Sequence, residues 1–469
     1  MQFFELLSRP QLEQIHEATL HILKDVGVDF HFPPALDVLA KGGARVEGNR
    51  VFFSPKMVEE QIRKAPSSFT IYARDPKKNV IIGGDNMAFV PAYGSPFVTS
   101  FEGGRRLGLL ADYENFVKLT HASPHQDICS GTVVEPNDVP HQIRHLQMLY
   151  TTIKNSDKCF MGSAMGTEGA RDSLKMAGIL FGDAAALAEK PRMISILCSL
   201  TPLTYESRML GAIMEYARAG QPQLISSLAI IGVTAPVTLA GALALQNAEI
   251  LAGIVLTQLI REGTPVVFSG SSSNAEMRSG ALSAGSPEMA INAAATAQMA
   301  RFYNIPVRAG GAVSDAKVPD VQAAQESMMN LLTAHVSGVH FVLHAAGILE
   351  SYNCISYEKF VIDDEACGAV RHMKKGVAVN PQSLAGQLIK DVGPGGQFLD
   401  KDHTLRHFRS ALFQPVLANR DNFHNWQEKG AVHMAETARR RCEEMIAGHV
   451  PPDLPADIDR DLRKLLQQR

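Results

Sequence analysis

Short apolar runs alternate with longer stretches of helical periodicity from about residue 85 onward. The runs are almost continuously apolar, which is typical of strands buried on both faces of a sheet, whereas half-exposed strands alternate with period two. In chain order they occupy residues 87–92, 127–134, 159–165, 192–200, 223–229, 264–270, 306–311 and 339–345. The pattern therefore predicts eight buried strands.

Most of these runs are separated by stretches with helical character, such as HQIRHLQMLYTTIKN and PDVQAAQESMMNLLTAHVSG. Buried strands joined by helices form parallel sheets that are covered on both faces. An open, doubly wound sheet would be favoured by a G-x-G-x-x-G fingerprint after the first strand, and none stands there. Eight repeats of strand and helix instead predict a closed (β/α)₈ TIM barrel.

The rhythm divides the chain into three regions. Residues 1–84 form a predicted N-terminal extension that packs on the barrel, mainly helical with a small β element. Residues 85–356 form the barrel itself. Residues 357–469 form a C-terminal helical region, which we expect to wrap the barrel or a neighbouring subunit. Within it, residues 423–448 have the pattern of one long amphipathic helix.

One stretch, residues 220–248, contains no charged side chain and is long enough to imitate a membrane span. Two prolines and several polar residues interrupt it, so a buried strand, a loop and a buried helix fit better. Residues 239–256 are apolar around most of a helical circumference, and we expect them to be buried in the protein or in a subunit interface. This helix is the basis for predicting a homo-oligomer.

The amino-acid composition limits which partners the protein is expected to bind and in which cellular compartment it is expected to occur. The 469 residues are 45% hydrophobic and 20% charged, with a net charge of −3 and no basic run, so nucleic acid and membrane lipid are not expected as partners. The six cysteines are scattered without a CxxC pair, which argues against a disulfide framework or a thiolate zinc site. Glu5 and Arg9 stand where a signal peptide would need an apolar core, so a cytoplasmic protein is predicted.

Two histidine pairs have a spacing that suggests metal ligands. His141 and His145 lie four apart in a predicted helix, but Gln142 takes the place of the glutamate base of a zinc hydrolase motif, and an exposed helix face is expected. His340 and His344 lie in a predicted strand, where four residues span about 13 Å, too far to share one ion. We therefore predict that the chain binds no metal.

Active sites of (β/α)₈ barrels lie where the strands end. The residues at those ends are mostly aromatic or small and polar, and aromatic rings hold quaternary ammonium groups through cation–π contacts worth about 0.5–2 kcal/mol each. Rings of this kind also serve simply as packing. The predicted substrate-binding residues are Tyr93, Phe97, Asn274, Arg308, Gly310, Gly311, Ser314, Asp315, His344 and Tyr352.

Several of these residues have a second interpretation. Arg308 would be an expensive buried cation without an anion, and its partner is either structural, Asp315 or Glu326, or a bound carboxylate. His344 is either a residue of the barrel mouth or a core histidine that donates to a backbone carbonyl. Asp315 either contacts the substrate or caps the following helix.

Three segments, residues 90–119, 233–270 and 285–326, resemble the trimethylamine methyltransferase family of corrinoid-dependent enzymes. The similarity extends from about residue 10 to residue 450. The resemblance implies a (β/α)₈ barrel that transfers a methyl group from an amine to Co(I) of a separate corrinoid protein. The cobalamin would then be carried by that partner protein and not by this chain.

All 469 residues are ordinary amino acids, whereas the trimethylamine enzymes contain pyrrolysine. The resemblance implies that the pyrrolysine position corresponds to one of the loops after the strands that end at Gly270 and Gly311. Members without pyrrolysine resemble glycine betaine, proline betaine and carnitine demethylases. A quaternary amine already carries a positive charge and leaves as a neutral tertiary amine, so it needs no electrophilic activation. The resemblance therefore implies a quaternary amine substrate, with glycine betaine, converted to dimethylglycine, as the leading choice.

In that interpretation, Arg308, His344, Asn274 or backbone N–H groups receive the betaine carboxylate. Gly310 and Gly311 leave the barrel open where substrate and corrin ring meet.

Three other functions compete with this one. The first is methyl transfer from a different quaternary amine. The second is a zinc-dependent methyl transfer to homocysteine, which would need soft ligands that the scattered cysteines do not supply. The third is a non-catalytic barrel that binds betaine.

Overall fold

Eight parallel strands form the centre of the computed structural model, which describes residues 3–468. Their spatial order follows their order in the chain, and β18 pairs with β6 to bring the sheet round on itself. Asp127 N donates to the Phe89 carbonyl across the remaining seam. The strands are β6 (Ala88–Phe89), β9 (Ile128–Cys129), β10 (Cys159–Met161), β11 (Met193–Cys198), β13 (Gln223–Ser227), β15 (Val266–Gly270), β17 (Val307–Arg308) and β18 (Phe341–Val342). Each lies within one predicted run, so the predicted barrel is confirmed.

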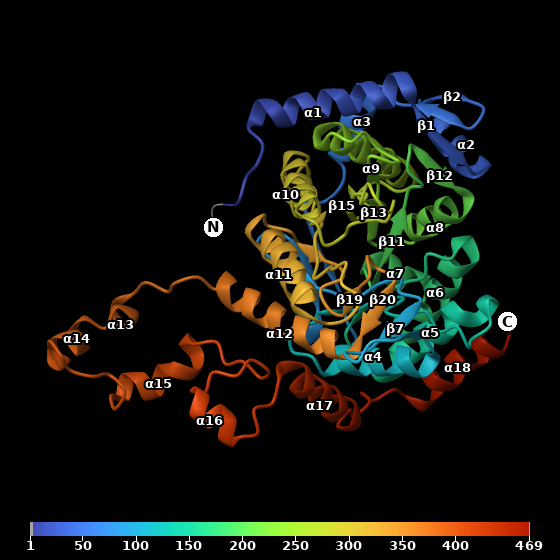
Figure 1. Cartoon of the computed structure of the whole chain (residues 1–469). Helices are drawn as coiled ribbons and strands as arrows, with labels where there is room; N and C mark the ends of the chain where they lie inside the picture. The colour runs from blue at the N-terminus through green and yellow to red at the C-terminus, as the bar shows by residue number, and fades with distance from the viewer. Residues whose placement is uncertain (1–2, 469) are drawn as a thin grey trace.

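One long helix follows each strand and covers the outside of the barrel (Figure 1). Several of these helices begin at side chains that satisfy their first backbone N–H groups: Ser286, Asp320 and Ser356 are N-caps. The helices are α4 (Leu110–Ala122), α5 (His141–Asn155), α6 (Gly166–Phe181), α8 (Ser207–Arg218), α9 (Leu239–Ile260), α10 (Pro287–Phe302), α11 (Val321–Val336) and α12 (Tyr357–Lys374), with the short α7 (Ala184–Glu189) before β11.

A hairpin closes the lower end of the barrel, where the strands begin. Its strands are β4 (Ser68–Ile71) and β5 (Val80–Gly83), joined through the short turn η2 (Pro76–Lys78). Buried Ile71 and Ile82 pack against the inward-facing strand residues. Tyr72 N donates to the carbonyl of Pro191, just before β11. The lower barrel is therefore filled by aliphatic side chains.

The rest of the N-terminal segment covers α9. Helix α1 (Arg9–His21) lies across α9, and α2 (Pro33–Lys41) and α3 (Pro55–Ile62) pack on it as well (Figure 1). Between them lie η1 (Ile22–Val26), β1 (Val28–His31), β2 (Arg45–Glu47) and β3 (Arg50–Phe52), with β1 paired to β12 (Thr204–Glu206). Within residues 3–468, α9 alone has the length and hydropathy of a membrane span, and 83% of its most apolar window is buried.

This arrangement explains the apolar circumference of α9 without a subunit interface. One face packs on β13 and β15, and the outer face is covered by α1 and α3 of the same chain. The helix therefore gives no support to the predicted homo-oligomer.

Small β elements lie in the loops beyond the upper ends of the strands. A four-stranded rim sheet contains β19 (Ile348–Leu349), β20 (Cys354–Ser356), β7 (Phe97–Thr99) and β8 (Arg105–Leu107), and β14 (Ile230–Ile231) pairs with β16 (Ser273–Asn274). These elements surround the mouth of the barrel.

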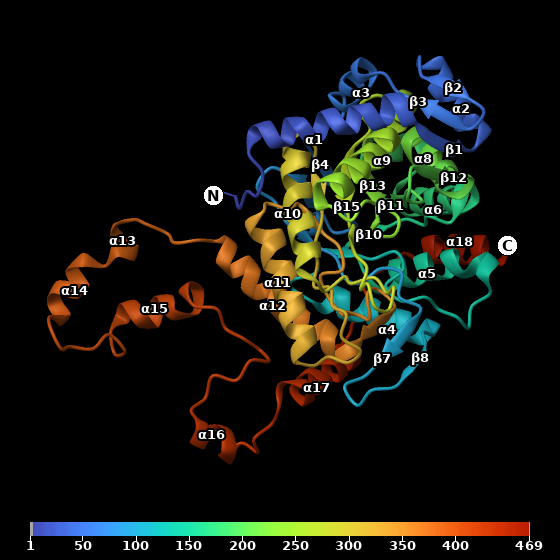
Figure 2. The same cartoon turned by 45° about the horizontal axis from the view of Figure 1, so that its top comes forward.

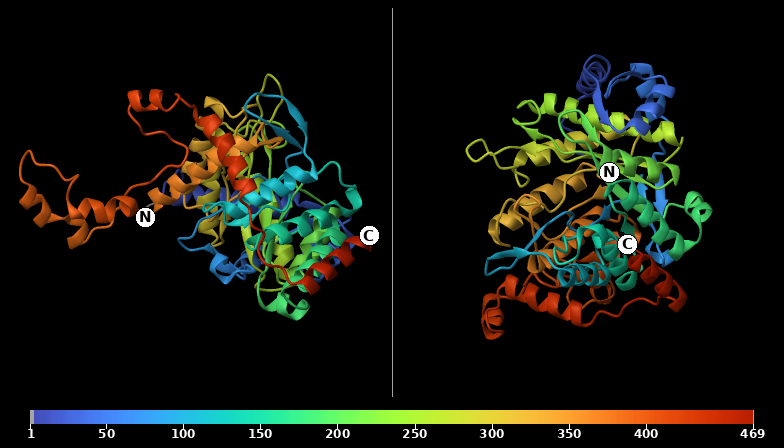
Figure 3. Two further views of the ribbon diagram at one scale, coloured as in Figure 1. Left: turned by 90° about the horizontal axis from the view of Figure 1, so that it is seen from below. Right: turned by 90° about the vertical axis from the view of Figure 1, so that its right-hand side faces the viewer.

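The chain after α12 leaves the barrel and returns to it (Figures 2 and 3). Its helices are α13 (Pro381–Leu384), α14 (Gly386–Val392), α15 (Asp402–Ala411), α16 (Phe423–Glu428), α17 (Met434–Ala447) and α18 (Ala456–Gln467). Helix α17 packs on α12 and α4, and α18 packs on α5 and α6. The prediction of one helix over residues 423–448 is wrong, because Gly430 and Ala431 both adopt positive φ and separate α16 from α17.

Candidate substrate site

Arg308 lies on β17 with only 2% of its surface exposed. Among the described residues its Nε has no hydrogen-bond partner, and no carboxylate lies within ion-pair distance of its guanidinium. Burial lowers the pKa of Arg308 from its ordinary value. A buried cation without an anion costs free energy, which a negatively charged ligand would recover.

Neither of the two structural partners expected for Arg308 pairs with it. Glu326 accepts from Ser314 Oγ at 2.7 Å and from Asp315 N at 2.8 Å. Asp315 in turn accepts from Ala284 N at 2.8 Å and from Ser351 Oγ at 2.5 Å. Both carboxylates therefore connect mouth loops to each other and provide no counterion for Arg308.

His344 follows β18 at the same end of the barrel and is 6% exposed. Its φ of 62° is left-handed, a strained conformation that is concentrated at functional sites. Tyr93 N donates to its Nδ1 at 3.2 Å, so this ring atom accepts from the backbone, in contrast to a core histidine that donates to a carbonyl. Burial, together with the nearby charge of Arg308, holds the pKa of His344 well below its usual range. The imidazole is therefore neutral at pH 7.

Tyr352 faces His344, with ring centroids 4.7 Å apart. It is the last of three consecutive residues with positive φ, Glu350 to Tyr352. Its buried Oη has no hydrogen-bond partner within the described part of the chain. Burial raises the pKa of Tyr352 to about 12, so the phenol stays protonated.

Tyr93 and Cys198 complete the upper interior, and both pack against the barrel's inner cluster. Burial raises the pKa of each, so the phenol and the thiol are neutral. The charge of Arg308 acts on Cys198, His344 and Tyr352 alike, which places the three around its guanidinium. The structure thus brings together one cation, a neutral imidazole, two phenols and a thiol.

The two glycines after Arg308 are required by local packing. At Gly310, with φ 64°, a Cβ would lie 2.9 Å from the Ala334 side chain on α11. At Gly311, with φ 139°, a Cβ would collide with the carbonyl oxygen of Leu343. The close approach of the backbone to its neighbours therefore requires glycine at both positions, whether or not a corrin ring comes near them.

Ser314, Asp315, Asn274 and Phe97 belong to the surrounding framework. The Asn274 amide accepts from Ser286 Oγ at 2.6 Å, beside the N-cap of α10. Phe97 lies in the rim sheet under the Arg105 guanidinium, which is 4.1 Å from the ring centroid. Burial is the main cause of the raised pKa of Tyr352, but the charge of Asp315 also raises it, so Asp315 borders the group around Arg308.

Glu249 is a framework residue that the sequence analysis missed. It is completely buried on α9 and accepts from the hydroxyls of Ser199, Thr201 and Ser227 and from the backbone of Leu203. It therefore fixes the loop after β11 at the mouth. Its signal in the sequence is that it is the first charge after the uncharged stretch of residues 220–248.

The histidines of α5 have separate environments. His141 is exposed, whereas His145 Nε2 lies 3.1 Å from the buried carboxylate of Asp172. Within residues 3–468, no group of three His, Cys, Asp or Glu side chains is arranged to hold a metal ion.

Comparison with known proteins supplies the family. Residues 1–469 match the family model described as trimethylamine methyltransferase (MTTB). The chain belongs to the trimethylamine methyltransferase family. It is therefore a methyltransferase, and the family as a whole works with corrinoid proteins, as the resemblance in the sequence implies.

Three known proteins are similar to this member of the trimethylamine methyltransferase family. The glycine betaine methyltransferase of Desulfitobacterium hafniense is 47% identical over 466 residues, 99% of this chain and 97% of that protein. The proline betaine:corrinoid methyltransferase of Eubacterium limosum is 32% identical, over 96% of this chain and 94% of that protein. The crystal structure of the Methanosarcina barkeri monomethylamine methyltransferase superimposes with a TM-score of 0.56 at 11% identity, covering 96% and 90% of the two chains, and supports the fold.

Proposed function

We propose that the enzyme demethylates glycine betaine to dimethylglycine and passes the methyl group to Co(I) of a separate corrinoid protein. The observation that carries this proposal is Arg308, a buried guanidinium without a counterion at the upper end of the barrel. A betaine carboxylate would provide that counterion. The 47% identity to a glycine betaine methyltransferase supports the same substrate.

Each group around Arg308 has a role in holding a zwitterion. Arg308 binds the carboxylate through charge-assisted hydrogen bonds. The phenol rings of Tyr93 and Tyr352 offer cation–π contacts to the trimethylammonium group. His344 stays neutral because of its lowered pKa, so it does not repel the ammonium group. Together these side chains orient one methyl group and exclude water from it.

The bond changes explain why no acid is needed. The methyl carbon–nitrogen bond breaks and its electron pair stays on nitrogen, so a quaternary amine leaves as a neutral tertiary amine. The corrinoid, when bound, supplies the Co(I) nucleophile that receives the methyl group. Trimethylamine would leave Arg308 without a counterion, because it has no carboxylate. The charge of the mouth therefore favours a betaine over a simple methylamine.

The visible spectrum of Co(I) cobalamin, kept reduced and mixed with the purified enzyme, tests the proposal. We expect conversion to methyl-Co(III) with glycine betaine, slower conversion with the bulkier proline betaine and carnitine, and none with trimethylamine. Choline, which has the ammonium group without the carboxylate, is the matched control and should not react. Equal rates with choline and glycine betaine would contradict the role of the carboxylate.

Free cobalamin is a substitute for the native partner, so a negative result needs a second experiment. If no amine reacts, the assay is repeated with the corrinoid protein from the same organism while betaine binding is measured by calorimetry. Binding without methyl transfer in that assay would overturn the proposal in favour of a non-catalytic betaine-binding barrel.

A further inference from the structure

Residues 373–416, here called the arm, leave the end of α12 and project away from the barrel (Figures 1 and 3). None of the arm's residues is buried. Many of its large apolar side chains face solvent in the isolated chain, namely Met373, Val377, Val379, Leu384, Ile389, Phe398, Leu399, Leu405, Phe408, Leu412 and Val416. A segment with so much exposed apolar surface is typical of one that is covered by another molecule.

The arm's helices also need outside support. Helices α13, α14 and α15 have 4, 7 and 10 residues. Isolated helices shorter than about 12–15 residues are marginal in water. Only the ends of the arm are held: it continues from α12, and Val416 N and the following Leu417 N donate to the Glu365 carboxylate of the same helix. The middle of the arm therefore has to be stabilised by contacts that one chain does not supply.

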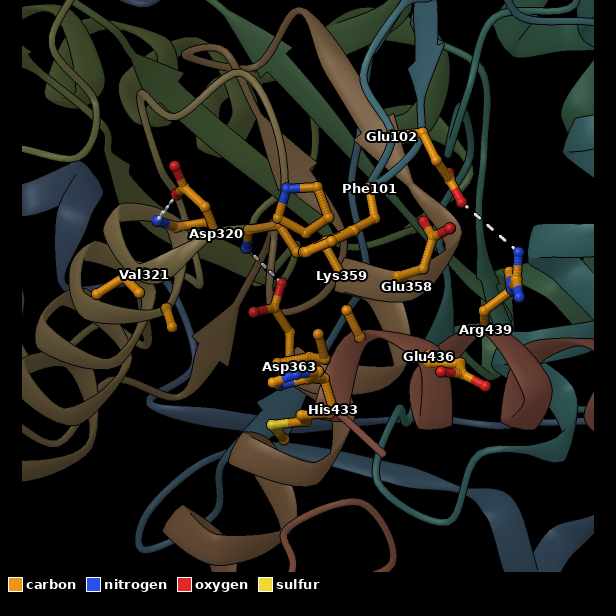
Figure 4. Close-up of a pocket in the computed structure, with 16 residues that line it drawn as sticks. Phe101, Glu102, Asp320, Val321, Glu358, Lys359, Asp363, His433, Glu436 and Arg439 are labelled. Carbon is orange, nitrogen blue, oxygen red and sulfur yellow. Dashed lines mark hydrogen bonds and ion pairs between the residues drawn. The ribbon is translucent and has the colours of Figure 1, made fainter. Parts of the chain in front are cut away.

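A groove on the same molecule has the matching character. It lies between the N-terminal ends of α11, α12 and α17 and the β7–β8 loop, with a cavity volume of about 750 Å³, enough for several side chains (Figure 4). Its walls are largely apolar, formed by Phe101, Val321, Ala324, Ile362 and Met434.

The charges of the groove and of α15 are opposite. Glu102, Asp320, Glu358, Asp363 and Glu436 line the groove against two cations, Lys359 and Arg439, an excess of three acids. Figure 4 shows Lys359 paired with Asp363 and Glu102 paired with Arg439. Asp320, Glu358 and Glu436 have no ion-pair partner within residues 3–468.

Residues 401–412, which include α15, carry three cations and one acid, an excess of two positive charges. Leu405 and Phe408 are spaced i and i+3, so they share one face of α15, and Leu412 directly follows the end of the helix. Arg409 lies beside that face. The segment thus presents an apolar stripe with positive charge at its edge, which complements an apolar groove with an acidic rim.

We propose that α15 of one copy docks in the groove of a second copy of this chain. The occupant is a second copy because arm and groove belong to the same chain, so one symmetric arrangement covers both surfaces twice. The arm of the same chain leaves the C-terminal end of α12 and extends away from the barrel, whereas the groove is bordered by the N-terminal half of α12 (Figure 1).

Residues in the wall of the groove also hold the backbone of the substrate site, so docking at the groove affects that site. Lys359 Nζ donates to the Ala312 carbonyl at 3.0 Å, and Asp363 accepts from Gly347 N at 2.8 Å. Ala312 N donates to the His344 carbonyl at 2.8 Å. The groove residues therefore hold Ala312, which pairs with His344, and Gly347, which lies three residues after His344, so the second copy stabilises the mouth of the first.

Sedimentation velocity of the full-length enzyme across a concentration series tests the proposal. The double variant Leu405→Asp/Phe408→Asp places two charges in the apolar stripe and should raise the dissociation constant of the assembly by about tenfold or more. Ser410→Asp adds the same charge to the opposite, exposed face of α15 and should leave the assembly intact. Neither site lies in the barrel core, so the circular dichroism of the double variant should differ from that of the other two proteins by no more than the loss of α15, whose 10 residues depend on the docking contact.

Exchanging two opposite charges tests whether Arg409 of α15 contacts Glu436 of the groove. Glu436→Arg and Arg409→Glu should each weaken the assembly, and the combination of both should restore it because the pair is reversed. A wild-type protein that stays monomeric at tens of micromolar, or an assembly that the double variant leaves unchanged, would overturn the proposal. Protection of a monomer's arm from protease would assign α15 to the groove of its own chain instead.

Discussion

At the lower end of the barrel, Ile71 and Ile82 of the β4–β5 hairpin fill the interior with aliphatic side chains. At the upper end, Arg308 Nε and Tyr352 Oη are buried without hydrogen-bond partners, and His344 and Tyr352 adopt left-handed φ angles. The same eight strands thus end in two different environments. The lower end contributes stability, whereas the upper end keeps unpaired groups and strain that only a ligand would offset.

The largest effect should come from Arg308→Met, which keeps much of the side chain's volume and removes its charge. We expect kcat/KM for glycine betaine to fall about 30-fold or more, because truncating one partner of a buried charge pair costs ~2–5 kcal/mol. The free energy of unfolding should stay the same or increase, because an uncompensated buried cation is lost. Methyl-transfer rates and chemical denaturation measure the two quantities, and a protein that loses stability without losing substrate affinity would assign Arg308 to the framework.

The opposite pattern is expected at the lower end. Ile82→Ala should reduce the free energy of unfolding by about 2–5 kcal/mol, because it leaves a cavity beneath the strands. Ile81→Ala is the matched control, since Ile81 is the preceding residue of β5 and is 49% exposed; its cost should be within about 0.5 kcal/mol. The folded fraction of both variants should keep the wild-type KM. A changed KM in Ile82→Ala would show that the two ends are not independent.

The smallest effect concerns protonation of His344. Its pKa is lower in the folded state than in the unfolded state, where it is about 6.5. The unfolded protein therefore binds the extra proton first, and the contribution of His344 to stability is complete above pH 6.5 and is lost as the pH falls below it. The loss approaches ~1.4 kcal/mol per pH unit.

Denaturation between pH 7.5 and pH 5 measures this loss, with His344→Asn as the comparison because asparagine tolerates left-handed φ. Half-buried histidines whose pKa is also lowered by burial, such as His121 and His125, titrate in both proteins and cancel in the difference. Parallel pH profiles for wild type and variant would contradict the environment assigned to His344.

The barrel was predictable because strands buried on both faces are nearly continuous apolar runs, which alternate along the chain with helical stretches. The rim strands β7, β8, β14 and β16 were not predicted, since two or three residues among glycines give no periodicity. Part of the candidate site could likewise be predicted from the sequence and part could not. An arginine within an apolar strand already indicates a buried cation, but the sequence does not tell whether a carboxylate reaches it. That depends on Asp315 and Glu326, whose partners come from loops more than ten residues away.

The cover over α9 has a consequence for biosynthesis. Helices α1 and α3 leave the ribosome before α9, and the surface they bury belongs to residues synthesised about 180 to 250 positions later. Until α9 emerges, their apolar faces have no native partner, and α9 in turn would be exposed on a chain that lacks them. Helices α1 and α3 therefore keep their apolar faces exposed until the middle of the barrel has been synthesised. A chaperone that covers these faces during that time would raise the yield of folded enzyme.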